Sequence, residues 1–263
     1  MTKVGSGSYT YELIQDWPKL PARQSLVVVS SVATDSQHRV YAFQQQDPPV
    51  MIFDRDGNYL NCWGIGAITD PHGINIVDDE VYITDRSDHV AVKFTLDGKP
   101  IQVIGDRGVF SDTGCENPGD LCPRAAGPFN YCTEMSTSPS GDIYISDGYR
   151  NARVHRFSRD GRLIHSWGQP GKESPGEFHL VHSLLVDPEG RVYVCDRANR
   201  RVQIFDDDGK YLKEWTYKGL PCGLHIAADQ QMYLASGFAG EILRLDKNGT
   251  AIGATGQPGK GLG

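Results

Sequence analysis

Short stretches of alternating apolar and polar residues recur along the chain, and turn dipeptides rich in glycine separate them. An Asp-Gly or Asn-Gly turn follows an apolar strand at Asp56-Gly57, Asp97-Gly98, Asp160-Gly161, Asp208-Gly209 and Asn248-Gly249. Such dipeptides between alternating runs are hairpin signals. The turns lie roughly 40 residues apart, with longer intervals where residues 105–128 and 168–177 are inserted. The pattern therefore predicts a repeated all-β unit.

The same side chains recur around each turn. A strand with tyrosine at a fixed register precedes the turn, at Tyr41, Tyr82, Tyr144, Tyr193 and Tyr233. Three of the strands that follow end in tryptophan, at Trp63, Trp167 and Trp215. Each unit has room for four short strands and little room for a helix, which is typical of a β-propeller blade. A β-sandwich would not repeat the same side chains at the same positions.

We therefore predict one all-β propeller domain over residues 1–263, with five complete blades. The blades are placed near 28–64, 70–105, 130–168, 178–217 and 220–256, and a single strand over 9–17 is expected to close the ring. The linker Gly168-Gln-Pro-Gly-Lys172 recurs at 256–260, where a sixth blade would begin. A longer protein, a ring of five blades and completion by another chain are the alternatives. The repeats favour a six-bladed ring whose last blade is missing from this chain.

Composition narrows the classes of partner. The 263 residues carry 33 acidic and 26 basic side chains, a net charge of −7, and 39% are hydrophobic. This is enough for a packed core, and the lack of a basic block argues against a nucleic-acid partner. We see no long apolar run and no apolar leader, so we expect a cytoplasmic protein without a membrane partner. The six cysteines are then expected to be mostly thiols. For Cys115 and Cys122 a loop staple and plain thiols both stay open.

Candidate metal ligands emerge when the repeats are aligned on the innermost strand of each blade. The aligned positions are Ser30, His72, Thr133, His182 and Cys222. The two histidines fall on alternate blades, so a third ligand on a sixth blade would complete a trigonal set. Catalytic zinc sites have such a set and keep one position open. Zinc is the expected ion. Cys222 is either a soft third ligand or a buried structural thiol.

Three blocks carry a resemblance to NHL repeats, at 147–154, 178–184 and 196–205. They include Asp-Gly-Tyr-Arg-Asn-Ala-Arg and Asp-Arg-Ala-Asn-Arg-Arg, and more narrowly they resemble the peptidyl-α-hydroxyglycine α-amidating lyases. The resemblance implies that channel histidines hold zinc and that Tyr149 takes a proton from a substrate hydroxyl. It also implies that Arg197 faces the cavity and can bind a carboxylate. Arg86 has the same register in blade two, and surface ion pairing is the plain alternative for both arginines.

One position departs from the family. The family's catalytic arginine corresponds to Gln45 here, and glutamine supplies no fixed positive charge. We therefore expect a metal-dependent lyase or hydrolase at the channel mouth, acting on a small molecule other than a simple peptidyl-hydroxyglycine. One alternative is a non-catalytic NHL scaffold that binds a protein partner through its rim. Another is a lactonase-like hydrolase around Ca²⁺, for which the aligned channel positions offer no carboxylate.

Overall fold

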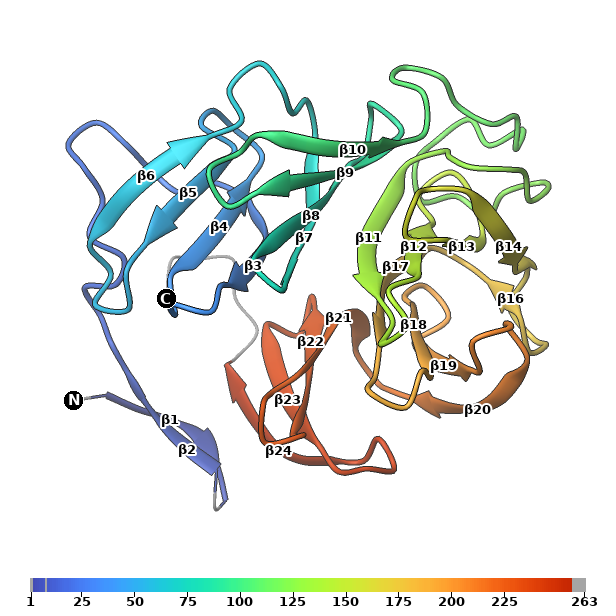
Figure 1. Ribbon diagram of the computed structural model, residues 1–263. Helices are drawn as coiled ribbons and strands as arrows, with labels where there is room; N and C mark the ends of the chain where they lie inside the picture. The colour runs from blue at the N-terminus through green and yellow to red at the C-terminus, as the bar shows by residue number, and fades with distance from the viewer. Residues whose placement is uncertain (1, 8, 257–263) are drawn as a thin grey trace.

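The computed structural model describes residues 2–7 and 9–256 and confirms an all-β propeller (Figure 1). Five four-stranded antiparallel sheets surround a central channel, and each sheet is one blade built in chain order. The first strands of successive blades contact one another, which makes them the innermost strands. Within the described ranges, no helix is long and apolar enough to cross a membrane.

The blades have the following bounds. Blade 1 is β3 (Val29–Thr34), β4 (Val40–Gln44), β5 (Val50–Phe53) and β6 (Tyr59–Trp63). Blade 2 is β7 (Pro71–Val77), β8 (Glu80–Asp85), β9 (Val90–Thr95) and β10 (Pro100–Ile104). Blade 3 is β11 (Cys132–Thr137), β12 (Ile143–Asp147), β13 (Arg153–Phe157) and β14 (Leu163–Trp167). Blade 4 is β17 (Val181–Val186), β18 (Val192–Asp196), β19 (Arg201–Phe205) and β20 (Tyr211–Thr216). Blade 5 is β21 (Leu220–Ile226), β22 (Met232–Gly237), β23 (Glu241–Leu245) and β24 (Ala251–Gly256). In the insertion before blade 4, β15 (Gln169–Pro170) pairs in parallel with β16 (Glu177–Phe178).

The repeated tyrosines pack between blades. The Tyr41 and Tyr144 side chains are fully buried, and Tyr193 is 4% exposed. Their hydroxyl groups find acceptors, as when Tyr41 donates to Asp35 and Tyr193 donates to Asp187. A buried phenol with a bonded hydroxyl contributes a large apolar surface without an unsatisfied polar group. The recurring tyrosine is therefore a packing residue of the blade.

A tryptophan ring packs directly on most of the turn glycines. Gly98 has φ +82°, a conformation that favours glycine, and a Cβ atom there would overlap the Trp63 ring of the preceding blade. Gly209 meets Trp167, and Gly249 meets Trp215, in the same way. Trp17 covers Gly57 of blade 1. The segment before blade 1 thus takes the place that the outer strand of a preceding blade takes elsewhere.

The N-terminal region differs from the single strand predicted over 9–17. It forms a hairpin of β1 (Thr2–Ser6) and β2 (Tyr9–Leu13), which contacts β24 of blade 5 (Figure 1). The Arg244 guanidinium lies 4.1 Å from the centroid of the Tyr9 ring, which fixes the hairpin against that blade. The repeated linker at 256–260 lies outside the described residues from 257 onward. The sixth blade stays a prediction.

Candidate active site at the channel mouth

A β-bulge interrupts the first strand of every blade at the same register. The pairing shifts at Val29/Ser31, Pro71/Ile74, Cys132/Glu134, Val181/Ser183 and Pro221/Gly223. The residues left out of the ladder are Ser30, His72 with Gly73, Thr133, His182 and Cys222, the positions aligned from the sequence. A bulge turns a side chain out of the regular pleat, which is why bulges often lie beside functional sites. Here it brings the His72 and His182 rings together, with centroids 4.8 Å apart.

Both histidines are held in one orientation by backbone carbonyl groups. His72 Nδ1 donates to the Thr133 carbonyl oxygen at 2.7 Å, and His182 Nδ1 donates to the Cys222 carbonyl oxygen at 2.7 Å. Each acceptor belongs to the bulge of the next blade. Because a carbonyl only accepts, Nδ1 carries the hydrogen and Nε2 carries the lone pair. Carbonyl partners of this kind orient histidines that bind metal ions.

The environment keeps the two rings neutral. Burial lowers the pKa of His72 to about 4, and the nearby Arg86 and Arg197 charges act in the same direction. Burial, followed by the charges of His72 and Arg197, holds the pKa of His182 well below its usual range. Neutral imidazole is the form that binds a metal ion. The pair is therefore ready to act as ligands at neutral pH without losing a proton.

Tyr149 lies directly against this pair. Its hydroxyl donates to His182 Nε2 at 3.1 Å and accepts from Arg197 Nη1 at 3.2 Å. The preceding residue is Gly148, where a Cβ atom would overlap the backbone of Val181 at the start of β17. Glycine at this position allows the chain of blade 3 to pass closely over blade 4. The phenol is thereby placed within one hydrogen bond of both a candidate ligand and a cation.

The two arginines at the mouth differ in how their charge is used. Arg86 makes a forked ion pair with Asp70, at 2.9 and 3.1 Å, and its guanidinium lies 4.7 Å from the centroid of the Tyr149 ring. Within the described part of the chain, no carboxylate pairs with Arg197. Arg197 instead contacts the Tyr149 hydroxyl and the Phe238 ring. Arg197 is therefore the cation whose charge is available to an anionic substrate.

Gln45 takes the same place in blade 1 that the arginines take in blades 2 and 4. Each is the first residue after the second strand, and its backbone N–H bonds a carbonyl just before the first strand. The acceptors of Gln45, Arg86 and Arg197 are Val28, Asp70 and Leu180, at 2.9, 2.9 and 3.0 Å. The Gln45 side chain is exposed and donates to the Pro71 carbonyl at 3.4 Å. The mouth thus carries an amide where a third guanidinium could stand.

Cys222 contributes its carbonyl group to the site. That oxygen orients His182, whereas the Cys222 sulfur packs against Gly237 of the neighbouring strand, and burial raises the pKa of the thiol. Among residues 2–7 and 9–256, no three His, Cys, Asp or Glu side chains gather in a way that could hold a metal ion. His72 and His182 therefore stand as a pair, and the third ligand stays a prediction.

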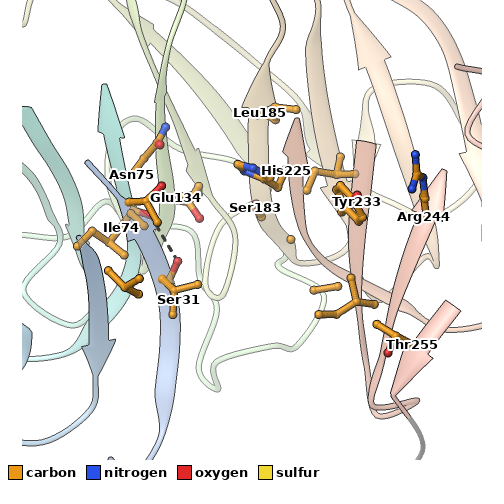
Figure 2. Close-up of a pocket in the computed structure, with 18 of the residues that line it drawn as sticks. Ser31, Ile74, Asn75, Glu134, Ser183, Leu185, His225, Tyr233, Arg244 and Thr255 are labelled. Carbon is orange, nitrogen blue, oxygen red and sulfur yellow. Dashed lines mark hydrogen bonds between the residues drawn. The ribbon is translucent and has the colours of Figure 1, made fainter. Parts of the chain in front are cut away.

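A separate cavity of about 700 Å³ occupies the other half of the channel and the space between blades 1 and 5. Figure 2 shows Ser31, Ile74 and Glu134 on one side and Tyr233, Arg244 and Thr255 on the other. Burial raises the pKa of the Glu134 carboxyl to about 8. Glu134 was not predicted from the sequence, although it is the one charged residue of β11 and was to that extent a visible signal. The cavity lining does not include the histidine pair, so we place the chemistry at the mouth.

Comparisons with known proteins fit this architecture. The NHL repeat family matches residues 178–205, which span β17 to β19. The human NHL repeat-containing protein 3 is 33% identical over 219 residues, which cover 78% of this chain and 59% of that protein. The Drosophila melanogaster peptidyl-alpha-hydroxyglycine alpha-amidating lyase 1 is 32% identical over 155 residues, covering 54% of this chain and 26% of that protein. A chain in a crystal structure of a nidogen/laminin complex shares the fold, with TM-score 0.65, 17% identity and coverage of 87% and 79%.

The fold defines the class of this protein, a β-propeller, and its fourth blade matches the NHL repeat. More particularly, the chain is homologous to NHL repeat-containing protein 3 and to the peptidyl-α-hydroxyglycine α-amidating lyases. It spans less than two thirds of the length of either relative described above.

Proposed function

We propose that this protein is a metal-dependent lyase that cleaves the C–N bond of a small carbinolamide bearing a carboxylate. The observation that carries the proposal is the convergence of His72, His182, Tyr149 and Arg197 on one point at the channel mouth. Two neutral imidazoles, a tyrosine oxygen and a guanidinium that pairs with no carboxylate of residues 2–7 and 9–256 are the groups that such a reaction needs. Homology to the amidating lyases supports the same class of reaction.

The donor set suits a divalent ion, for which zinc is the expected identity. His72 and His182 would hold it through Nε2, since their Nδ1 atoms are committed to backbone carbonyls. When bound, such an ion would polarise the hydroxyl oxygen of the substrate and make its proton easier to remove.

Tyr149 would then transfer the proton, and Arg197 would bind the substrate carboxylate. If His182 Nε2 held the ion, the Tyr149 hydroxyl would no longer donate to that nitrogen and would release its proton to solvent. The resulting phenolate oxygen, beside Arg197, would then accept the hydroxyl proton from the substrate. As the C–O bond gains double-bond character, the C–N bond breaks and the amide nitrogen takes up a proton. An amide and an aldehyde acid result. Arg197 holds the carboxylate on the reacting carbon and fixes its orientation.

Gln45 restricts the substrate class. An amide at this position offers a neutral donor where a guanidinium would stabilise negative charge. We therefore propose a small carbinolamide whose carboxylate is held by Arg197 alone, without a second guanidinium at the position of Gln45.

The metal is tested by elemental analysis of the purified protein. We expect close to one equivalent of zinc in the native chain and loss of it in the His72→Ala/His182→Ala double variant. His165→Ala is the matched control because His165 is exposed on β14 and stacks on Trp167. Full zinc content in the double variant would overturn the assignment of these ligands.

The reaction is tested with α-hydroxyhippurate, a carbinolamide with one carboxylate. We expect the release of benzamide and glyoxylate, and Tyr149→Phe should lower kcat by about 100-fold or more, since it removes the proton acceptor and keeps the ring. An unchanged kcat in Tyr149→Phe would exclude this residue as the acceptor.

A non-catalytic NHL scaffold is the second candidate. It rests on the homology to NHL repeat-containing protein 3, whose name states no activity. Absence of zinc from the native chain together with absence of turnover would support the scaffold over the enzyme.

A further inference from the structure

The insertion at 105–128 carries two buried cysteines that the candidate site does not use. Cys115 and Cys122 are each 5% exposed, although they belong to a surface loop. A tight turn lies between them, because Asp120 N–H donates to the Asn117 carbonyl at 3.2 Å. The Asn117 side-chain amide also donates to the Asp120 carboxylate, at 3.0 Å. The chain therefore folds back on itself and brings the two cysteines to the same side of the loop.

The two thiol groups meet inside this loop. Both sulfur atoms point at the Asp120 carbonyl oxygen, at 3.8 Å for Cys115 and 3.9 Å for Cys122. Burial, followed by the proximity of Cys115, raises the pKa of the Cys122 thiol. The thiol of Cys132, by contrast, donates to carbonyl groups of blade 2.

The same loop lies against the candidate site. Gly119 N–H donates to the Tyr149 carbonyl oxygen at 2.6 Å, and His179 Nε2 contacts the Gly119 carbonyl at 3.2 Å. Arg150 Nε donates to the Cys115 carbonyl at 3.0 Å. The segment between the two cysteines therefore supports the backbone of Tyr149 and its neighbour.

We propose that Cys115 and Cys122 form an intrachain disulfide that closes this loop against Tyr149. The oxidant is a small-molecule disulfide such as oxidised glutathione. One cysteine, as thiolate, attacks it to give a mixed disulfide and releases one glutathione thiolate. The second cysteine then displaces the other glutathione, and the two protons lost by the protein go to the two glutathione thiolates. The proposal is independent of the lyase reaction.

The first test is peptide mapping of the full chain without reduction, after incubation in glutathione buffers of increasing oxidation. We expect one cross-linked peptide that contains Cys115 and Cys122, with the mass of two hydrogens lost. Cys115→Ser and Cys122→Ser should each abolish it, and Cys62→Ser is the control because Cys62 lies on β6 of blade 1. Complete alkylation of both thiols at every buffer ratio would overturn the proposal, as would pairing of either one with another cysteine.

The second test measures the loop itself and does not depend on turnover. Limited proteolysis should cut residues 105–128 several-fold more slowly in the oxidised chain than in the reduced chain. The Cys115→Ser variant should be cut at the reduced rate under both conditions. Equal rates for the oxidised and reduced native chain would show that no bond closes this loop. Because zinc content and α-hydroxyhippurate cleavage are measured separately, failure here would not be mistaken for failure of the proposed function.

Discussion

Blades 4 and 5 are built from strands of similar length and the same register, yet only blade 4 is covered on both faces. All of β19 in blade 4 is buried, whereas in β23 of blade 5 only Leu245 is. Val202 is fully buried, and Ile242 at the equivalent position is 50% exposed. Blade 4 contacts blades 3 and 5, while the far side of blade 5 borders the cavity in Figure 2 and the N-terminal hairpin.

This difference shows that the alternating pattern specifies strands, while the neighbouring blade determines how much of each strand is buried. It also bears on the candidate site. The side chains that converge there come from blades 2, 3 and 4, which have a blade on either side. Blade 5 contributes the Cys222 carbonyl and the Phe238 ring, both at its edge. The side chains that form the candidate site thus come from blades 2, 3 and 4, where a neighbouring blade on each side holds them in place.

The largest effect is expected from the same substitution made in each of the two blades. Ile204→Ala in β19 removes fully buried methyl groups and should lower the free energy of unfolding by about 2–5 kcal/mol. Ile242→Ala in β23 should cost less than about 1 kcal/mol, because half of that side chain is already in water. Urea unfolding of both variants checks this. Equal losses would mean that the far side of blade 5 is covered in solution.

Blade 1 offers a comparison at the mouth. Gln45→Arg places a guanidinium at the position that Arg86 and Arg197 occupy in blades 2 and 4. We expect kcat/KM for α-hydroxyhippurate to rise about tenfold, because a charge-assisted contact to the carboxylate replaces a neutral one. Gln46→Arg is the matched control, since it adds the same charge to a side chain that bonds Ser25 instead. An equal rise of kcat/KM in Gln46→Arg would mean that added positive charge, and not its position at residue 45, causes the increase.

Much of this fold follows from local sequence. Four of the five turn glycines lie under a tryptophan ring, so turn, strand and packing partner repeat together, whereas Gly161 of blade 3 meets Gln102 instead. The positions that the bulges leave out of the ladder were aligned from the sequence, although the bulge of blade 2 also includes Gly73. The hairpin strand Thr2–Ser6 was not, because its turn has no Asp-Gly signal and its partner surface is β24.

The candidate site was predictable in its members and not in its contacts. The sequence placed the two histidines at one register, but the carbonyl groups that orient them belong to the next blade. The ion pair of Arg86 with Asp70, which leaves Arg197 as the available cation, depends on how the side chains pack. Glu134 and Phe238 belong to no repeated motif. Their importance comes from the three-dimensional structure, which buries Glu134 and places Phe238 beside Arg197.

Glu134 supplies a smaller effect that depends on pH. Its register equivalent in blade 4 is Ser183, so blade 3 alone of the two carries a carboxyl in the channel. Burial raises the folded pKa from 4.5 to about 8, so the folded state keeps a proton that the unfolded state loses. Stability should therefore fall as pH rises from about 4.5 to about 8, and the loss persists above that range.

Glu134→Gln removes this penalty. We expect the variant to gain about 1–3 kcal/mol over the native chain near pH 9 and little near pH 4. Urea unfolding across that range measures the difference, with Glu116→Gln as a control because Glu116 is exposed. A gain independent of pH would show that the Glu134 carboxyl does not titrate as its burial implies.

The smallest effect concerns Phe238, where blade 4 carries Ala198 in the equivalent turn. The Phe238 ring is 83% exposed, its backbone has φ +61°, and the Arg197 guanidinium lies 5.7 Å from its centroid. A cation–π contact at an exposed site is worth about 0.5–1 kcal/mol, so Phe238→Leu should raise KM for α-hydroxyhippurate about two- to fivefold and leave kcat nearly unchanged. Phe238→Asn also removes the ring but suits a positive φ, so it should match Phe238→Leu in KM and exceed it in stability. An unchanged KM in both variants would mean that the Phe238 ring does not position Arg197. Phe238 would then contribute no more to substrate binding than Ala198 does at the equivalent position of blade 4.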